Sequence, residues 1–314
     1  MHLANAVNHV SIVKGMKASA LVSQMAGSGV FGAGRIAKAN DVMQHMLKDR
    51  QCTVFLGIAG AMVPGGMKNI IVDMLESGRV DVLVSTGANL THDLVEALGH
   101  RHLKGESDAD DKKLHDQHMV RMYDSLMPNK VYEELEDFFE KQYDALKNIN
   151  TIKDFLWKLG SLVPNTKGNK SILRTCAERK IPLFCPAIAD SGIGLMIWGH
   201  ITRGREKDKC KVLAFEDMKE MMQLAWNAKR AGVIYVGGGV PKNYIQQAMQ
   251  LAPKGAEYGV QITSDRPEPG GSSGASLKEG VSWGKMSPKG EFVDVYCDAT
   301  IALPLLWAAV KDAL

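Results

Sequence analysis

The sequence has few cysteines and no pattern among them. The five cysteines are odd in number and scattered, and none forms the C-x-x-C pair of a zinc site or a redox couple. No run of about 18 apolar residues, the length that spans a bilayer, occurs anywhere. The start, MHLANAVNHV, lacks the basic residues and continuous apolar core of a signal peptide. We therefore expect reduced thiols, no metal, no membrane association and a cytoplasmic protein.

A large net charge of one sign is also missing. Lys and Arg number 38 against 35 Asp and Glu, which leaves a formal charge of +3. So small a charge produces no broad attractive field for phosphates, which argues against nucleic-acid binding as the main activity. With 45% hydrophobic residues, a chain of 314 residues can bury a substantial core without disulfide bonds or structural metal ions. We expect one domain over residues 1–314, with an N-terminal helical extension over about residues 1–50.

Short β-branched apolar runs alternate with longer segments of helical periodicity. This alternation is typical of an α/β protein with a parallel sheet and crossover helices. Ligands of such sheets bind beyond the carboxyl ends of the strands, so chemistry is expected there. The expected strands are 53–59, 80–85, 182–188, 233–236, 258–263 and 293–297, and the expected helices are 34–48, 65–77, 132–146, 215–231 and 301–313. Residues 104–118, which are polar and of mixed charge, are expected to form a surface excursion.

One literal G-x-G-x-x-G motif, Gly27 to Gly32, lies in the wrong context for a dinucleotide fingerprint. That fingerprint needs a strand before it and a helix after it. The preceding residues 17–26 are helix-like. We expect a helix–loop–helix joint here.

Three glycine-containing turns follow predicted strands. They lie in TVFLGIAGAMVPGGM (53–67), VSTGANLTHD (84–93) and VGGGVPKN (236–243). Small side chains let backbone N–H groups approach an anion at a helix N-terminus. The first turn, taken alone, is equally consistent with an ordinary strand-to-helix connection. Two such turns side by side favour a nucleotide site, and the three consecutive glycines indicate a close approach to the backbone. Lys242, near a helix start, fits either a catalytic or a solvated lysine, and we expect it to be solvated.

The C-terminal third carries the most informative cluster. It comprises ITSDRPEPGGSSGA (262–275), EGVSWGK (279–285) and DAT (298–300). Lys285, two residues after Trp283 and close to Glu279, fits a desolvated amine suited to Schiff-base chemistry. On spacing alone, a surface lysine beside a core tryptophan is the more frequent arrangement.

Several of these motifs resemble the deoxyhypusine synthase family. They are STGANLTHD (85–93), GGGVPKN (237–243), SWGK (282–285) and DAT (298–300), and the similarity covers roughly residues 20–314. The resemblance implies a Rossmann-like, doubly wound, mostly parallel sheet with helices on both faces. It also implies a homotetramer with active sites at subunit interfaces.

The resemblance further implies a transfer in two stages. Bound NAD takes hydride from spermidine, 1,3-diaminopropane leaves, and the aminobutyl group is held as an imine on Lys285. A lysine of the hypusine-containing translation factor, a translation factor 5A-type protein, then displaces Lys285 from the imine. The stored hydride reduces the new imine. The implied NAD contacts are Gly60, Ala61, Pro64, Thr86, Gly87, Ala88, His92, Asp190, Gly238, Ser264, Asp298 and Ala299. The implied substrate contacts are Asn243, Gly270, Ser272, Glu279 and Trp283.

Three positions depart from the eukaryotic pattern. Leu195, Asn243 and Ser272 stand where those enzymes have an aspartate, a histidine and an aspartate of the spermidine pocket. Losing two carboxylates is expected to weaken recognition of a long polycation unless Asp93, Asp265 or Glu268 compensates. Two alternatives stay open: an enzyme that forms homospermidine with putrescine as acceptor, and an inactive partner subunit.

Overall fold

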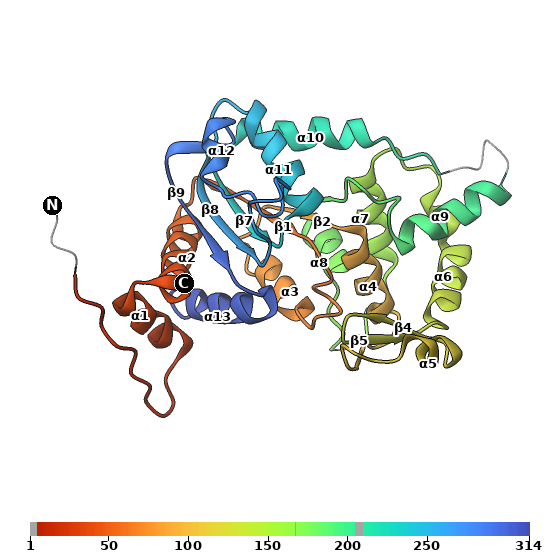
Figure 1. Ribbon diagram of the computed structural model, residues 1–314. Coiled ribbons are helices and arrows are strands. Elements are labelled where there is room, and N and C mark those ends of the chain that lie inside the picture. The colour runs from red at the N-terminus through yellow and green to blue at the C-terminus, as the bar shows by residue number, and fades with distance from the viewer. Residues whose placement is uncertain (1–4, 167, 205–209) are drawn as a thin grey trace. The chain divides into compact units, whose positions relative to one another are not determined.

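The apolar runs of the sequence form parallel strands in the computed structural model, which describes residues 5–166, 168–204 and 210–314 (Figure 1). The chain divides into two units. Unit 1 comprises Met1–Ile58 and Met221–Leu314, and unit 2 comprises Ala59–Glu220. The single domain expected over 1–314 stays a prediction, and one cooperative transition in calorimetry would support it.

Unit 1 is built on four parallel strands in the order β1-β7-β8-β9. Most of their residues are buried, as is usual for parallel strands covered on both faces. The register pairs Ile58 with Val236 and Val236 with Ile262, so the carboxyl ends of three strands meet at one edge. The strands are β1 (Cys52–Ile58), β7 (Arg230–Val236), β8 (Ala256–Thr263) and β9 (Met286–Tyr296).

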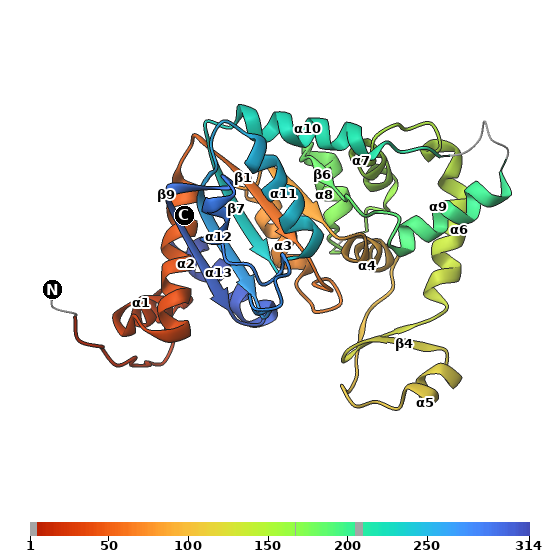
Figure 2. The same ribbon diagram turned by 45° about the horizontal axis from the view of Figure 1, so that its top comes forward.

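Helices cover both faces of this sheet (Figure 2). A Cβ added at Gly232 would lie 2.6 Å from Met46 of α2 (Phe31–Lys48). On the other face, a Cβ added at Gly57 would lie 3.1 Å from Ile245 of α11 (Gly239–Leu251). Glycine at these two positions lets the helices approach the sheet closely. The α/β fold with a mostly parallel sheet and helices on both faces is confirmed.

The N-terminal part of unit 1 is helical. The first two helices, α1 (Ala18–Ser28) and α2, are joined at Gly29, whose φ of 66° is readily available to glycine. The expectation of a helix–loop–helix joint at the G-x-G-x-x-G motif is therefore confirmed. The C-terminal helix α13 (Ala299–Lys311) packs against both α1 and α2. Unit 1 also contains the short helix α12 (Glu279–Ser282).

Unit 2 combines a parallel strand pair with a set of helices. The pair is β2 (Val82–Ser85) and β6 (Leu183–Phe184). The helices are α3 (Lys68–Glu76), α4 (Gly87–Ala97), α5 (Asp111–Asp116), α6 (Val131–Leu146), α7 (Ile152–Leu162), α8 (Ile172–Arg179) and α9 (Gly192–Arg203). A further helix, α10 (Ala214–Asn227), contains the boundary between the units.

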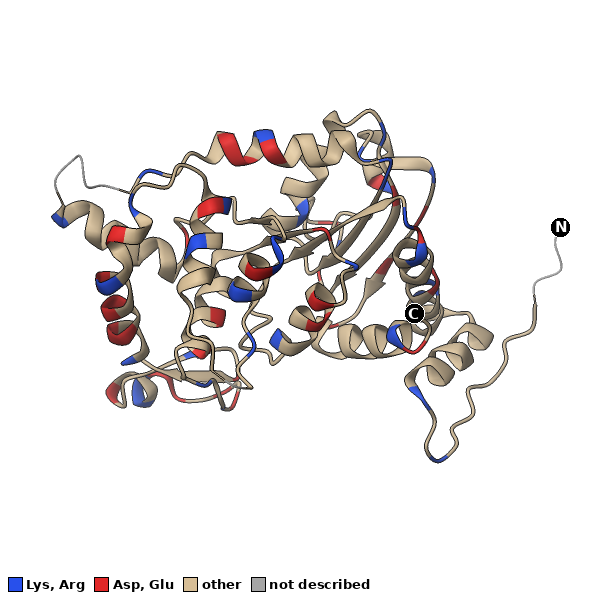
Figure 3. Cartoon of the chain, turned by 180° about the vertical axis from the view of Figure 1, so that it is seen from behind, with Lys and Arg blue, Asp and Glu red and all other residues tan. Residues whose placement is uncertain are grey.

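The polar excursion of unit 2 is more ordered than the sequence indicates. It contributes to a three-stranded antiparallel sheet of β3 (Leu103–Lys104), β5 (Ser125–Pro128) and β4 (Met119–Met122). These strands have only 2, 4 and 4 residues, which is too short for a clear alternating pattern in the sequence. Basic and acidic segments are interleaved on the helices in Figure 3, as the small formal charge suggests. Among the described residues, no helix is long and apolar enough to cross a membrane.

Candidate active site

One pocket of unit 1 gathers the predicted catalytic lysine and the predicted substrate residues. Its volume is about 170 Å³. The lining comes from α11, from the loop after β8 and from the segment around α12. The predicted residues in the lining are Asn243, Gly270, Ser272, Glu279, Trp283 and Lys285. The structure thus brings these six residues together, although up to 42 positions separate them in the sequence.

Lys285 faces an aromatic wall of this pocket. Its Nζ lies 5.0 Å from the centre of the Trp283 ring, a distance at which a cation is attracted to the ring face. Between them, Gly284 has a φ of 72°, and the Lys285 N–H donates to the Gly280 carbonyl at 2.8 Å. Trp283 is 56% exposed, so the interpretation of a surface lysine beside a core tryptophan is wrong. The ring is available to a ligand.

A second lysine lines the same pocket. Lys242 is only 4% exposed, and its Nζ donates to the carbonyl oxygens of Ser272, at 2.8 Å, and Ala275. Burial lowers the pKa of Lys242 to about 8, although Asp294 and Glu279 oppose the shift. The expectation of a solvated Lys242 is therefore wrong.

A helical pattern in the sequence could have indicated that burial. Lys242, Ile245 and Met249 are spaced i, i+3 and i+7, which places the lysine on the buried face of α11. Because charged side chains are usually exposed, the sequence analysis predicts a solvated Lys242 despite this spacing. The two hydrogen bonds to loop carbonyls make the burial tolerable.

The loop that forms one wall of the pocket is fixed to the sheet by hydrogen bonds. The Gly239 N–H donates to Ser273 Oγ at 2.8 Å, and Gln261 Nε2 donates to the Ser273 carbonyl at 2.8 Å. A Cβ added at Gly238 would lie 2.3 Å from Ser273 Cα, so only glycine fits there. The triple glycine therefore accommodates the chain's own loop.

Unit 2 holds eight of the predicted NAD contacts on three adjacent turns. Thr86 Oγ1 donates to the Gly60 carbonyl at 3.5 Å, and Asn89 bonds both to Thr86 Oγ1 and to the Val63 N–H. A Cβ added at Gly87 would lie 2.4 Å from Ser191 Cβ, next to the turn of Asp190. The eight residues are Gly60, Ala61, Pro64, Thr86, Gly87, Ala88, His92 and Asp190.

The start of α4 suits an anionic group. Its N-cap residue, Thr86, forms no side-chain hydrogen bond to the first turn, so those N–H groups lack a protein acceptor from the cap. Helix N-termini of this kind attract phosphates. Ala88 is exposed and Gly60 has a φ of 71° in an exposed turn, which leaves the backbone accessible. These residues fit the pyrophosphate of a dinucleotide.

The other four predicted NAD contacts lie in unit 1, after its strands. Gly238 follows β7, Ser264 follows β8, and Asp298 and Ala299 follow β9. Asp298 caps α13, because its Oδ1 accepts from the Thr300 N–H at 2.8 Å. This role is compatible with a ligand contact through the second carboxylate oxygen. The NAD contacts of both units stay predictions.

The suggested compensation by Asp93 is wrong. Its carboxylate is fully buried and accepts from Ser171 Oγ and from the N–H groups of Ile172 and Leu173 at 2.8–2.9 Å, where it caps α8. Burial raises the pKa of Asp93 against the effect of these bonds. Asp93 is thus a structural cap, whereas Asp265 and Glu268 are exposed. Leu195, on α9 of unit 2, is 58% exposed.

The fold and the pocket define a class: an α/β protein with a lysine and a tryptophan in a polar pocket. Comparison with known proteins identifies the family. The family model described as deoxyhypusine synthase matches residues 20–310. "Probable deoxyhypusine synthase 1" of Methanosarcina mazei is 44% identical over 314 residues, which cover 100% of this chain and 96% of the relative. "Probable deoxyhypusine synthase 1" of Archaeoglobus fulgidus is 42% identical over 306 residues, 98% of each chain.

A solved structure shares the fold. The "putative deoxyhypusine synthase from Entamoeba histolytica" superposes with a TM-score of 0.63 at 18% identity, covering 96% of each chain. The chain belongs to the deoxyhypusine synthase family. The resemblance inferred from the motifs is confirmed, and membership places the chain among the aminobutyl transferases.

Proposed function

We propose that this protein is an NAD-dependent deoxyhypusine synthase. It transfers the aminobutyl group of spermidine, through an imine on Lys285, to a lysine of a translation factor 5A-type protein. The observation that supports this most strongly is the pocket in which Lys285 faces Trp283 beside Glu279 and Asn243.

The pocket residues have different roles in the transfer. The Lys285 amine attacks the imine carbon of the oxidised donor; a C=N bond to Nζ forms as the bond to the departing diamine breaks. The Glu279 carboxylate pairs with a substrate ammonium, and the exposed face of Trp283 attracts it by a cation–π contact. Lys242 holds the loop that shapes the pocket.

NAD, when bound, supplies the acceptor and later the donor of the hydride. In unit 2, the first-turn N–H groups of α4 would bind its phosphates, and the Asn89 amide keeps the Gly60 and Thr86 turns adjacent. The open backbone at Gly60 allows a close approach.

A second acceptor remains a candidate because of the pocket's charge. The pocket is lined by two lysines and by one carboxylate, Glu279. Neutral Ser272 and Asn243 occupy two of the positions at which this chain differs from the eukaryotic pattern. This composition favours a shorter, less charged amine better than a pocket rich in carboxylates does. The alternative is transfer to putrescine, which forms homospermidine and shares every step up to the Lys285 imine.

The test is a competition between acceptors. The purified protein, NAD and spermidine are incubated with putrescine and a translation factor 5A-type protein together, and the products are weighed by mass spectrometry. An aminobutyl increment on the protein acceptor supports the proposal. Homospermidine supports the alternative, and an absence of both products supports the inactive subunit. Sedimentation of the same preparation tests the predicted homotetramer, and fractionation of cells tests the predicted cytoplasmic location.

A further inference from the structure

One buried polar side chain of the pocket around Lys285, the lysine pocket, lies outside the sequence motifs. Gln246, on α11, lines this pocket together with Gly280 and Lys285, although only 5% of its surface is exposed. A glutamine so deeply buried either has partners at both ends of its amide or directs one end to a ligand. The contacts of the amide therefore show what this residue can bind.

The nitrogen end of the Gln246 amide is anchored in the core. Nε2 donates to the Tyr235 hydroxyl at 2.9 Å and contacts Met286 Sδ at 3.6 Å, and Tyr235 and Met286 are both fully buried. A thioether sulfur only accepts hydrogen bonds, so the NH2 group of Gln246 faces Met286 and the carbonyl oxygen does not. This contact fixes which end of the amide is the nitrogen.

The oxygen end of the amide lies at the wall of the pocket. A Cβ added at Gly280 would lie 3.2 Å from Gln246 Oε1 and 3.6 Å from the Cβ of Lys285, so a side chain at position 280 would crowd this oxygen. Among the described residues, no group donates a hydrogen bond to Oε1. Oε1 is also not one of the fully buried side-chain atoms that lack a partner. Because Gln246 lines the pocket, this unused acceptor is accessible from it.

The neighbouring lysine does not occupy this acceptor. Among the described residues, Lys285 Nζ forms no hydrogen bond, and it lies 5.0 Å from the centre of the Trp283 ring. An amide oxygen accepts from an ammonium without carrying a charge, whereas a carboxylate at this place would also favour the protonated form of Lys285. An imine forms only from the unprotonated amine. A neutral acceptor therefore suits a site that binds one amine and leaves another reactive.

We propose that Gln246 is a further substrate-binding residue, whose Oε1 accepts a hydrogen bond from a terminal ammonium of the polyamine donor. Tyr235 and Met286 are positioning residues that hold the amide in this orientation. The inference rests on the proposed function, because it requires a polyamine in the lysine pocket. The chemistry that Oε1 recognises is a primary ammonium, which donates hydrogen bonds and accepts none.

Calorimetric titration of spermidine into the full-length protein, with saturating NAD, tests this contact. Gln246→Met removes the acceptor and should weaken binding roughly 10- to 100-fold, the usual range for a hydrogen bond to a charged group. Tyr235→Phe leaves the oxygen but removes its anchor, and should weaken binding roughly 2- to 5-fold. Gln250→Met changes an exposed residue of the same helix outside the pocket lining and should stay within about twofold of wild type.

Two analogues of spermidine, each without one terminal amine, show which ammonium is bound. N-butyl-1,3-diaminopropane lacks the amine of the aminobutyl end, and N-propyl-1,4-diaminobutane lacks the amine of the aminopropyl end. The analogue without the bound amine should bind equally to wild type and to Gln246→Met, whereas the other analogue should show the full loss. A purely structural role of Gln246 would weaken the binding of both analogues alike.

Gln246→Glu separates binding from chemistry. The carboxylate still accepts from the ammonium, and the Tyr235 hydroxyl can donate to it, so spermidine should bind at least as tightly as to wild type. The kcat for release of 1,3-diaminopropane should fall roughly 10-fold, because the added carboxylate favours protonated Lys285. If the NH2 group faced the pocket, Gln246→Glu would weaken binding as Gln246→Met does.

The outcomes separate this inference from the proposed function. Wild-type affinity for spermidine in Gln246→Met, equal losses with both analogues, or weaker binding in Gln246→Glu overturns the inference and leaves the transfer intact. Gln246→Glu, which keeps the size and the acceptor, decides the point if Gln246→Met does not fold. A wild-type protein that binds no spermidine and releases no 1,3-diaminopropane contradicts the proposed function and this contact together.

Discussion

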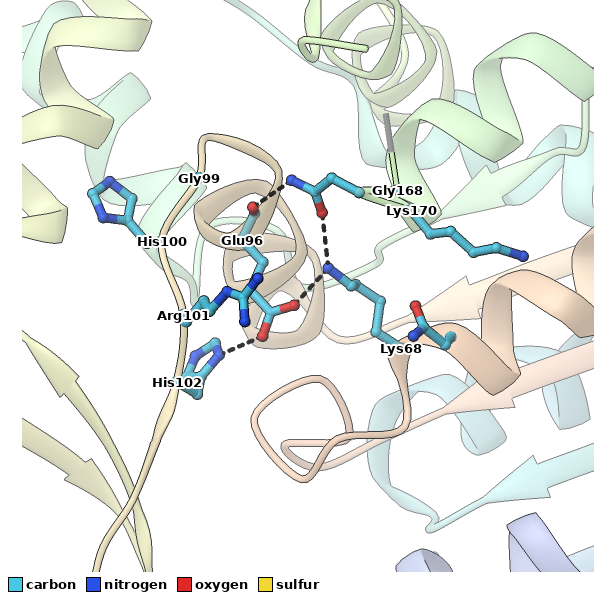
Figure 4. A pocket seen from close by; sticks show the side chains of 10 residues that line it. Lys68, Glu96, Gly99, His100, Arg101, His102, Gly168 and Lys170 are labelled. Atoms are coloured by element: carbon cyan, nitrogen blue, oxygen red, sulfur yellow. Dashed lines mark hydrogen bonds and ion pairs between the residues drawn. The ribbon is translucent and has the colours of Figure 1, made fainter. Parts of the chain in front are cut away.

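The lysine pocket of unit 1 and the cluster of Lys68, Glu96 and His102 in unit 2 use charged side chains in opposite ways. Among the described residues, Lys285 Nζ has no hydrogen bond or ion pair, and its partner is the face of Trp283. In that cluster, Lys68 and His102 both contact the Glu96 carboxylate (Figure 4). A group that reacts has to be free of strong protein partners, whereas a group that positions another gains from being fixed.

The same contrast separates the two lysines of the pocket. Lys242 is buried and donates to two backbone carbonyls, while Lys285 is half-buried and points to an exposed ring. We therefore assign a structural role to Lys242 and the catalytic role to Lys285. Substitution of Lys285 should reduce aminobutyl transfer, whereas substitution of Lys242 should reduce stability as well.

The largest effect is expected from removing the reactive amine. Lys285→Ala should lower aminobutyl transfer by at least about a thousandfold, because the covalent step is lost. Binding of NAD, measured by calorimetry, should stay within about twofold of wild type. Lys289→Ala, at an exposed lysine four residues away, is the control. Clear transfer by Lys285→Ala would remove this lysine from the mechanism.

Loss of the structural lysine should reduce stability as well as activity. Lys242→Met leaves the carbonyls of Ser272 and Ala275 without their donor, which we expect to cost about 1–3 kcal/mol in the free energy of unfolding. Urea titration measures it. Lys278→Met, an exposed lysine outside the pocket, should change stability by less than about 0.5 kcal/mol. Equal stability of both variants would contradict the assignment.

The pH dependence of stability gives a signature of the same lysine. The pKa of Lys242 is about 8 in the folded protein, against the ordinary lysine value of 10.5 in an unfolded chain, so the unfolded state holds more protons between these values. The free energy of unfolding should therefore rise with pH from about 8 to 10.5 as the buried charge is lost. Below pH 8 the buried charge should destabilise the folded protein to its full extent. Urea titrations across this range should show the rise in wild type and a smaller one in Lys242→Met. Parallel curves for the two proteins would argue against a buried charged lysine.

The smallest expected effect comes from restoring one carboxylate. Ser272→Asp places a negative charge in the wall of the pocket and should lower the KM for spermidine by roughly 3- to 10-fold, with less effect on putrescine. Steady-state kinetics with both amines measures the difference. Ser282→Asp, which adds the same charge outside the pocket lining, should leave KM unchanged. A higher KM in Ser272→Asp would exclude an ammonium at this wall.

Local patterns predicted the features that depend on neighbouring residues. All six expected strands form, although β6 is reduced to Leu183–Phe184. The helix–loop–helix joint at Gly29 was predictable because the helical periodicity on both sides is local. The convergence of Asn243, Ser272 and Lys285 was implied by the family resemblance alone, because Lys285 directly precedes β9 and so does not lie beyond the carboxyl end of a strand.

Features that depend on distant partners were not predictable in this way. The spacing of α11 indicates the burial of Lys242, but the carbonyls that bind it come from a loop 30 residues further on, which no local pattern indicates. The cluster at Glu96 joins α3, α4 and His102, and no spacing in the sequence pairs a lysine with a histidine 34 positions away. The capping role of Asp93 was missed because Ser171 and α8 follow about 80 residues later.

The most direct test of the central assignment is to trap the imine on Lys285. The protein is incubated with NAD and spermidine without an acceptor, reduced with borohydride, digested and sequenced by mass spectrometry. The assignment predicts an aminobutyl increment on the peptide that contains SWGK (282–285), at Lys285. An increment on Lys242 in its place, or turnover without any trapped adduct on the protein, would contradict it.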